Sequence, residues 1–161
     1  MEDSSPRRIV LLCGVPGSGK SHYMMQTFQH IAGAVSVSAD DFFVGVDGVY
    51  RFNPAQLKAA HGTCLLDFIE ALEAGRPVVV VNNTNTTAIE MAPYVALAWP
   101  YDYDVEIVRI LCSDLELAAR RNRHGVPLAA IEAMDRRITK TFEEGLPPFW
   151  NVKVTTVSAD Q

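Results

Sequence analysis

Short hydrophobic runs alternate with longer mixed segments along this chain. The short runs are rich in β-branched residues and lie at residues 9–13, 34–38, 77–81, 105–111 and 151–157. Such runs are typical of strands buried in a parallel sheet. Their alternation with helix-length segments predicts an α/β fold, with a central parallel sheet of about five strands that helices cover on both faces.

Glycine, proline and capping residues set the predicted helix boundaries. Residues 20–31 contain no glycine or proline and predict the first helix. The second helix is capped by Asn53, begins at Pro54 and ends at Gly75. A third follows the polar turn after the third strand and runs towards residue 99, bent or begun at Pro93. Residues 40–53, rich in acids, aromatics and turn-forming residues, predict a loop.

Two further helices are predicted before the last strand. The fourth begins after Asp114 as N-cap, carries an arginine cluster and ends at Gly125. The fifth begins at Pro127 and continues to about residue 141. The sequence contains no stretch typical of an interdomain linker, so we expect one domain over residues 1–161, with residues 1–7 disordered.

The segment GVPGSGKS, at residues 14–21, fits the phosphate-binding loop pattern G-x-x-x-x-G-K-S/T at every position. In this pattern, glycines let backbone N–H groups curl around phosphates, the lysine reaches the outer phosphates, and the hydroxyl ligates Mg²⁺. A predicted strand precedes the segment and a predicted helix follows it, as the pattern requires. The sequence therefore predicts a P-loop fold that binds a nucleoside triphosphate and Mg²⁺ through Gly14, Pro16, Gly17, Ser18, Gly19, Lys20 and Ser21.

Composition narrows the class of protein. The chain has 161 residues, 48% of them hydrophobic and 20% charged, which suits a globular domain with a substantial core. A formal net charge of −5 argues against binding nucleic acid through a globally basic surface, but it leaves room for a local basic groove. The three cysteines lack metal-ligand spacing, and no hydrophobic run is long enough to cross a bilayer. We therefore expect a soluble, cytoplasmic protein without a membrane partner.

Two acids follow the second predicted strand. Ligands of open α/β sheets bind beyond the carboxyl ends of the strands, so residues at these positions are candidates for chemistry. Asp40 and Asp41 suit the activation of an acceptor hydroxyl in phosphoryl transfer. We favour Asp40 as the base and expect Asp41 to bind substrate. The alternative is that both acids cap the turn that follows.

An arginine cluster lies near the end of the fourth predicted helix, at Arg120, Arg121 and Arg123. Guanidinium groups suit the clamping of phosphates and the stabilisation of transition-state charge. At helical spacing Arg120 and Arg123 share a face, so we expect these two to be catalytic on a mobile lid and Arg121 to contact the nucleotide. The alternative is a solvated basic face at a helix C-terminus, where the helix dipole favours positive charge.

The polar turn after the third predicted strand reads N-N-T-N. Many phosphate-loop proteins have an acid here that holds Mg²⁺ through water, whereas this chain has Asn82. A neutral amide accepts a hydrogen bond from such a water but supplies no charge, so we expect Ser21 and Asn82 at the metal. The following residues are candidates for binding substrate: Asn83, Thr84 and Asn85. Alternatively, the turn satisfies backbone groups and caps the next helix.

Histidines add little to this picture. The four histidines show neither metal-ligand spacing nor a nucleophile triad. His124 adjoins the arginine cluster, but a lone histidine at such a position favours a structural role.

Taken together, these motifs resemble the polynucleotide 5′-hydroxyl kinase family over nearly the whole chain. The matching segments are S-A-D-D-F-F at residues 38–43, G-V-Y-R-F-N-P at 48–54, A-H at 60–61, N-N-T-N at 82–85 and A-R-R-N-R-H-G-V at 119–126. The resemblance implies ATP- and Mg²⁺-dependent transfer of the γ-phosphate to the 5′-OH of DNA or RNA. It implies Asp40 as general base and lid arginines at residues 120–123. Two departures are Asn82, where the family has Asp, and Phe43, where a phage member has an arginine that contacts the acceptor.

Three functional hypotheses follow from the sequence. The first is a kinase whose hydroxyl acceptor is a polynucleotide 5′-end. The second is a kinase for a small metabolite, because Phe43, Tyr50 and Phe52 suit either a stacking surface for a base or a lid over a small molecule. The third, motivated by Asn82, is an ATP-binding module that has lost turnover and acts through a protein partner.

Overall fold

The sheet of this protein has five parallel strands in the order β2-β3-β1-β4-β5, in a computed structural model that describes residues 6–158. The strands are β1 (Arg8–Cys13), β2 (Val35–Val37), β3 (Val78–Val81), β4 (Asp104–Leu111) and β5 (Val152–Ser158). Each coincides with a predicted hydrophobic run to within about two residues, and the predicted α/β fold is confirmed. Because every strand pair is parallel, all carboxyl ends lie at one edge of the sheet.

Strand β1 lies at the centre of the sheet, between β3 and β4. Residues 9–13 are completely buried, because helices cover both faces of the sheet at this position. The continuous apolar run IVLLC places apolar side chains on both faces of the sheet. A strand with one solvated face would instead alternate apolar and polar residues. The phosphate-loop segment therefore starts from the most constrained strand of the fold.

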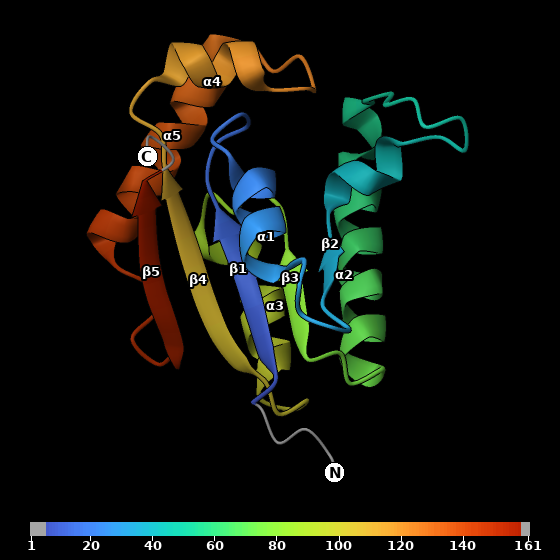
Figure 1. The fold of residues 1–161 in the computed structure, drawn as a ribbon. Helices are drawn as coiled ribbons and strands as arrows, with labels where there is room; N and C mark the ends of the chain where they lie inside the picture. Colours follow the sequence, from blue (N-terminus) through green and yellow to red (C-terminus); the bar gives the residue numbers. More distant parts are fainter. Residues whose placement is uncertain (1–5, 159–161) are drawn as a thin grey trace.

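Helices form a layer on each side of the sheet (Figure 1). Helix α1 (Lys20–Phe28) packs on one face, where Phe28 joins Val10, Leu12 and Val80 in a small core. The opposite face carries the larger core under α2 (Leu57–Glu73), α3 (Ala88–Ala98), α4 (Leu115–Arg121) and α5 (Leu128–Glu144). None of the helices within residues 6–158 combines the length and hydrophobicity needed to cross a membrane.

Predicted caps lie at the observed ends of α2. The Asn53 side chain accepts a hydrogen bond from the N–H of Ala55, and Pro54 begins the first turn. That turn is a separate 3₁₀ helix, η2 (Pro54–Gln56), which continues directly into α2. Gly75 follows the helix with φ +66°, a left-handed conformation that glycine adopts without strain.

The segment predicted as a loop at residues 40–53 begins instead with a 3₁₀ helix, η1 (Ala39–Phe43). Ser38 caps η1, because its hydroxyl accepts a hydrogen bond from the N–H of Asp40. Beyond η1, residues 44–53 form an arm that extends from the body of the protein, with an antiparallel bridge between Val44 and Tyr50. The loop prediction was therefore wrong for residues 39–43. The 3₁₀ helix η1 holds the backbone of Asp40 in a defined position.

The fourth predicted helix is shorter than expected. Helix α4 ends at Arg121 rather than at Gly125, so Arg123 lies outside it. The side chain of Asn122 explains this end: its Nδ2 donates to the carbonyls of Ala119 and Val126, and its Oδ1 accepts from the N–H of Val126. The prediction that Arg120 and Arg123 share a helical face was consequently wrong.

Near the N-terminus, the expected disorder covered residues 1–7, of which 1–5 lie outside the described residues. Arg7 is described, and its carbonyl accepts a hydrogen bond from the N–H of Asp104. Its guanidinium contacts the ring of Tyr103.

Candidate functional site

The phosphate-loop residues connect the carboxyl end of β1 to α1. Gly17 and Gly19 have φ values of +77° and +96°, a backbone conformation that residues with a Cβ rarely adopt. A Cβ at Gly17 would also collide with the carbonyl oxygen of Ala118 in α4. No side chain among the described residues caps the N-terminus of α1, which leaves its first N–H groups for an anion. The loop therefore has the backbone geometry of a phosphate cradle.

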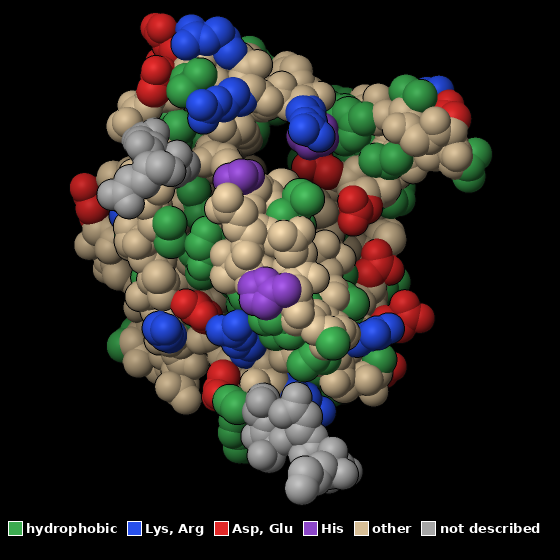
Figure 2. All heavy atoms as spheres, in the orientation of Figure 1, with side chains coloured by type: hydrophobic (Ala, Val, Ile, Leu, Met, Phe, Trp, Pro, Cys, Tyr) green, Lys and Arg blue, Asp and Glu red, His purple; other side chains and the backbone are tan. Residues whose placement is uncertain are grey.

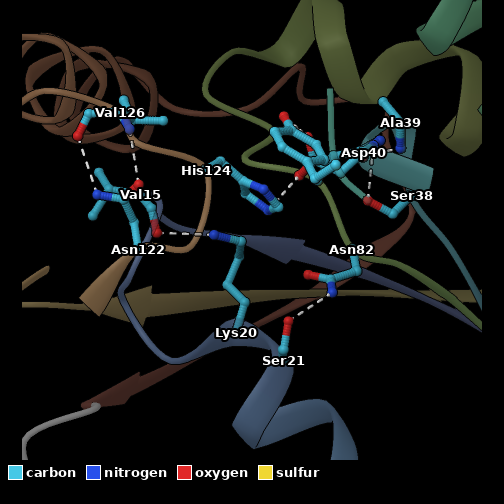
Figure 3. Close-up of polar contacts among 12 residues, drawn as sticks. Val15, Lys20, Ser21, Ser38, Ala39, Asp40, Asn82, Asn122, His124 and Val126 are labelled. Atoms are coloured by element: carbon cyan, nitrogen blue, oxygen red, sulfur yellow. Dashed lines mark hydrogen bonds and ion pairs between the residues drawn. The ribbon is translucent and has the colours of Figure 1, made fainter. Parts of the chain in front are cut away.

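Lys20 turns its side chain back over the loop. Its Nζ donates to the carbonyl oxygens of Gly14 and Val15, at 2.9 and 2.8 Å (Figure 3). Burial lowers the pKa of Lys20 to about 8, and the carboxylate of Asp40 acts in the opposite direction by favouring the charged form.

Two more loop residues have defined surroundings. Ser18 is buried, and its hydroxyl has no hydrogen-bond partner within residues 6–158. Ser21, in the first turn of α1, accepts a hydrogen bond from Nδ2 of Asn82 at 3.1 Å. The end of β3 therefore meets the end of β1, and the two residues expected at the metal are neighbours (Figure 3).

The donor set around Ser21 fits Mg²⁺ held mainly by a nucleotide. Mg²⁺ keeps several waters and binds through one or two protein oxygens together with substrate phosphates. A serine hydroxyl and an amide oxygen, with no carboxylate, match that limited protein contribution. In the same described residues, no group of three His, Cys, Asp or Glu side chains is placed to hold a metal by itself.

Asp40 makes two side-chain contacts with segments far from it in sequence. Its Oδ1 accepts a hydrogen bond from the Tyr50 hydroxyl at 3.2 Å, and its Oδ2 lies 3.4 Å from Nε2 of His124. The rings of Tyr50 and His124 pack together, with centroids 4.2 Å apart. Burial and the Asp40 charge raise the pKa of Tyr50 to about 12, so its hydroxyl stays protonated and donates at neutral pH.

A hollow separates the segment around α4 from the arm, as Figure 2 shows. Basic, acidic and histidine side chains gather at its rim. The three predicted arginines are exposed. They are Arg120 and Arg121 in the last turn of α4, and Arg123 in the following loop.

The residues after Asn82 turn inward. Asn83 is buried, accepts a hydrogen bond from the N–H of Ala39 and points its Nδ2 at the sulfur of Cys64. Asn85 is 2% exposed and donates to the carbonyl of Leu12.

The main chain of this turn also joins the loops of the site. Asn85 has φ +46°, which asparagine tolerates better than most residues. The carbonyl of Thr84 accepts a hydrogen bond from the N–H of Gly14. The amides of Asn83 and Asn85 thus join β1, β3 and η1, because buried amides require partners inside the protein, and their assignment to substrate stays a prediction.

Asp41 and Phe43 differ in their exposure. Asp41 is exposed overall, but partial burial of its carboxyl, together with the nearby carboxylates of Asp40 and Asp67, raises its pKa. Phe43 is 5% exposed and packs edge-to-face against Tyr50 and Phe52, so it supports the arm from within. It is not available as a stacking surface for a base.

Sequence reasoning missed two participants in the site. Tyr50 was considered for stacking and not as a hydrogen-bond donor to Asp40, and His124 was given a structural role. Tyr50 and His124 lie 10 and 84 residues after Asp40 in the sequence. The sequence could have pointed to both residues, because they lie inside G-V-Y and R-N-R-H-G-V, two motifs that resemble the kinase family.

Comparisons with known proteins identify the family and the fold of this chain. Residues 9–141 match the AAA_33 family, described as an AAA domain. The chain is 34% identical to NEDD4-binding protein 2 of Homo sapiens over 134 residues, which are 78% of this chain and 7% of that protein. It therefore spans a small part of the relative that it matches.

Solved structures share the fold. A chain in the structure of the Pnkp1/Rnl/Hen1 RNA repair complex superposes with a TM-score of 0.69 at 23% identity, covering 89% of this chain and 47% of that chain. A chain from the PezAT chromosomal toxin-antitoxin system of Streptococcus pneumoniae gives a TM-score of 0.66 at 16% identity, covering 98% of this chain and 70% of that chain. The phosphate loop, the order of the motifs and the match over residues 9–141 lead to one conclusion: this chain belongs to the AAA_33 family of polynucleotide kinase-like P-loop proteins.

Proposed function

We propose that this protein is an ATP- and Mg²⁺-dependent kinase that transfers the γ-phosphate to a hydroxyl group, with the 5′-OH of a polynucleotide as its acceptor. One observation carries the proposal: Asp40, which follows β2, and the phosphate-loop residues Lys20 and Ser21 lie at the same edge of the sheet (Figure 3). A donor site and a candidate acceptor base therefore belong to one hollow.

The donor half consists of the phosphate loop. Backbone N–H groups around Gly17 and Gly19 bind the phosphates, and Lys20 exchanges its two carbonyl partners for phosphate oxygens. Ser21 and Asn82 would hold Mg²⁺, which would supply positive charge against the phosphates.

The acceptor half consists of Asp40. Its carboxylate orients the acceptor hydroxyl for attack on the γ-phosphorus and accepts the hydroxyl proton late in the transfer. Tyr50 remains a hydrogen-bond donor to Oδ1, which fixes the carboxylate. The exposed arginines at Arg120, Arg121 and Arg123 supply positive charge to the transferring group when the lid segment closes.

A polynucleotide acceptor is supported by the arm as well as by the family. Phe42 and Phe52 are 37% and 50% exposed, and they lie on the same segments as Asp40 and Tyr50. Exposed aromatic rings beside a hydroxyl-binding carboxylate suit bases that stack without sequence preference. The exposed arginines across the hollow suit phosphates of the same strand.

A panel assay tests the proposal. Purified protein is incubated with γ-labelled ATP, Mg²⁺ and either 5′-OH single-stranded DNA, 5′-OH single-stranded RNA, nucleosides or sugars. We expect label on the oligonucleotides. Label on a sugar or nucleoside alone would identify a metabolite kinase instead, and ATP binding without label on any acceptor would favour the module that acts through a partner.

A further inference from the structure

His124 lies on the carboxylate that the proposed mechanism assigns to the acceptor. Its Nε2 is 3.4 Å from Oδ2 of Asp40, a contact that becomes an ion pair when the imidazole is protonated. Its ring also packs on Tyr50, whose hydroxyl binds the other carboxylate oxygen. Three segments of the chain therefore meet at this carboxylate: η1, the arm and the loop after α4 (Figure 3).

Hydrogen bonds tie the loop that carries His124 to the end of α4. Asn122 closes it through hydrogen bonds to Ala119 on one side and Val126 on the other. Gly125, with φ +68°, completes the turn. Because the loop is tied to the helix end, a change in the position of His124 is expected to shift α4 and the neighbouring Arg123.

The Asp40 contact joins the α4 segment to the opposite wall of the hollow. The side chains of His124 and Asp40 remain 34% and 49% exposed, so solvent and a ligand can reach the contact. A hydroxyl that approaches Oδ2 to be deprotonated must enter the space that the imidazole occupies. The acceptor and the histidine therefore compete for the same carboxylate oxygen.

We propose that His124 is a positioning residue that latches the lid, defined as residues 115–127, onto Asp40, and that the acceptor hydroxyl displaces it. This inference rests on the proposed kinase function and adds a coupling between acceptor binding and lid position. The free protein divides between latched and open forms, and the acceptor binds the open form. The apparent Kd for the acceptor is therefore the Kd of the open form divided by the fraction of protein that is open.

Steady-state kinetics with His124→Phe isolate the latch. Phenylalanine keeps a ring on Tyr50 and removes the nitrogen that faces Asp40. We expect the KM for a 5′-OH oligonucleotide to fall about three- to tenfold, with kcat no higher than in the wild type. His124→Gln, which keeps a polar group, is expected to give a smaller fall. His30→Phe, in the exposed turn after α1, is the control.

The KM for ATP distinguishes a latch from general damage. It should change less than about twofold in His124→Phe, because the imidazole contacts Asp40 and Tyr50, which lie on the acceptor side of the hollow. An acceptor KM that rises, or that stays within twofold of the wild-type value, would overturn the proposal.

Hydrogen–deuterium exchange tests the latch without turnover. In His124→Phe and in Asp40→Asn, amides of residues 115–127 should exchange at least about twofold faster than in the wild type, and amides of β1 should not change. Unchanged exchange in the lid of both variants would rule the latch out. If the wild type labels no acceptor, the kinase proposal fails, and the exchange result alone decides whether the lid is latched.

Discussion

Asp40 and Lys20 show how single residues acquire their properties from the fold. Lys20 donates to two backbone carbonyls, and burial lowers its pKa to about 8. Asp40 is held between a tyrosine hydroxyl and an imidazole. Both residues could be chosen from the sequence by motif and spacing. Their partners could not, because the contacts depend on where η1 and the loop after α4 lie.

Replacing Asp40 by Asn should remove phosphoryl transfer while leaving ATP binding intact. The amide oxygen can still accept the Tyr50 hydrogen bond, but it cannot take up a proton. We expect the rate to fall at least about 100-fold and the Kd for ATP to change less than about twofold. Single-turnover transfer and calorimetric titration with ATP measure the two effects.

Asp104→Asn is the matched control for that substitution. Asp104 is exposed at the opposite edge of the sheet, where β4 begins, so its variant should retain wild-type turnover. If Asp40→Asn turned over as fast as Asp104→Asn, Asp40 would lose the role of base.

The lowered pKa of Lys20 predicts a pH dependence of ATP binding. Above pH 8 the free protein holds mostly neutral Lys20, whereas phosphates favour the charged form, so binding requires the uptake of a proton. Affinity should therefore weaken as pH rises, with a Kd about tenfold higher at pH 9 than at pH 7. Titrations between pH 7 and 9.5 measure this slope. The Lys20→Met variant should bind ATP weakly, with a Kd that does not depend on pH. A wild-type Kd for ATP that is constant from pH 7 to 9.5 would contradict the lowered pKa of Lys20.

At the scale of elements, hydrophobic runs predicted the five strands and capping residues predicted α2 and the start of α4. Both signals are local, so a single sequence suffices to identify them. The end of α4 is set instead by Asn122, whose side chain bonds the backbone on both sides of it. The preference of glycine for helix ends suggested Gly125, and that expectation placed Arg123 on the helix incorrectly.

Asn122→Ala should destabilise the lid segment. The substitution removes three hydrogen bonds, at 2.7, 3.1 and 2.8 Å, in a partly buried loop. We expect the free energy of unfolding to fall by about 1 to 2 kcal/mol, measured by urea denaturation. Asn151→Ala, at an exposed position before β5, is the control. Equal stability of the two variants would show that Asn122 does not hold the loop.

At the scale of the whole molecule, the strand order β2-β3-β1-β4-β5 gathers the site. It brings Asn82 beside Ser21 and His124 beside Asp40, pairs that are 61 and 84 residues apart in the chain. The general rule for open sheets predicted which edge carries the site. The rule does not specify which polar residues turn inward, so the burial of Asn83 and Asn85 could not be predicted from it.

The most direct test of the account compares two oligonucleotides of identical sequence, one with a 5′-OH and one with a 5′-phosphate. Each is incubated with the protein, Mg²⁺ and γ-labelled ATP, and the labelled product is mapped to its end. The account predicts label at the 5′-end of the first oligonucleotide and none on the second. Label on neither strand, or equal label on both, would contradict a kinase that acts on a polynucleotide 5′-hydroxyl.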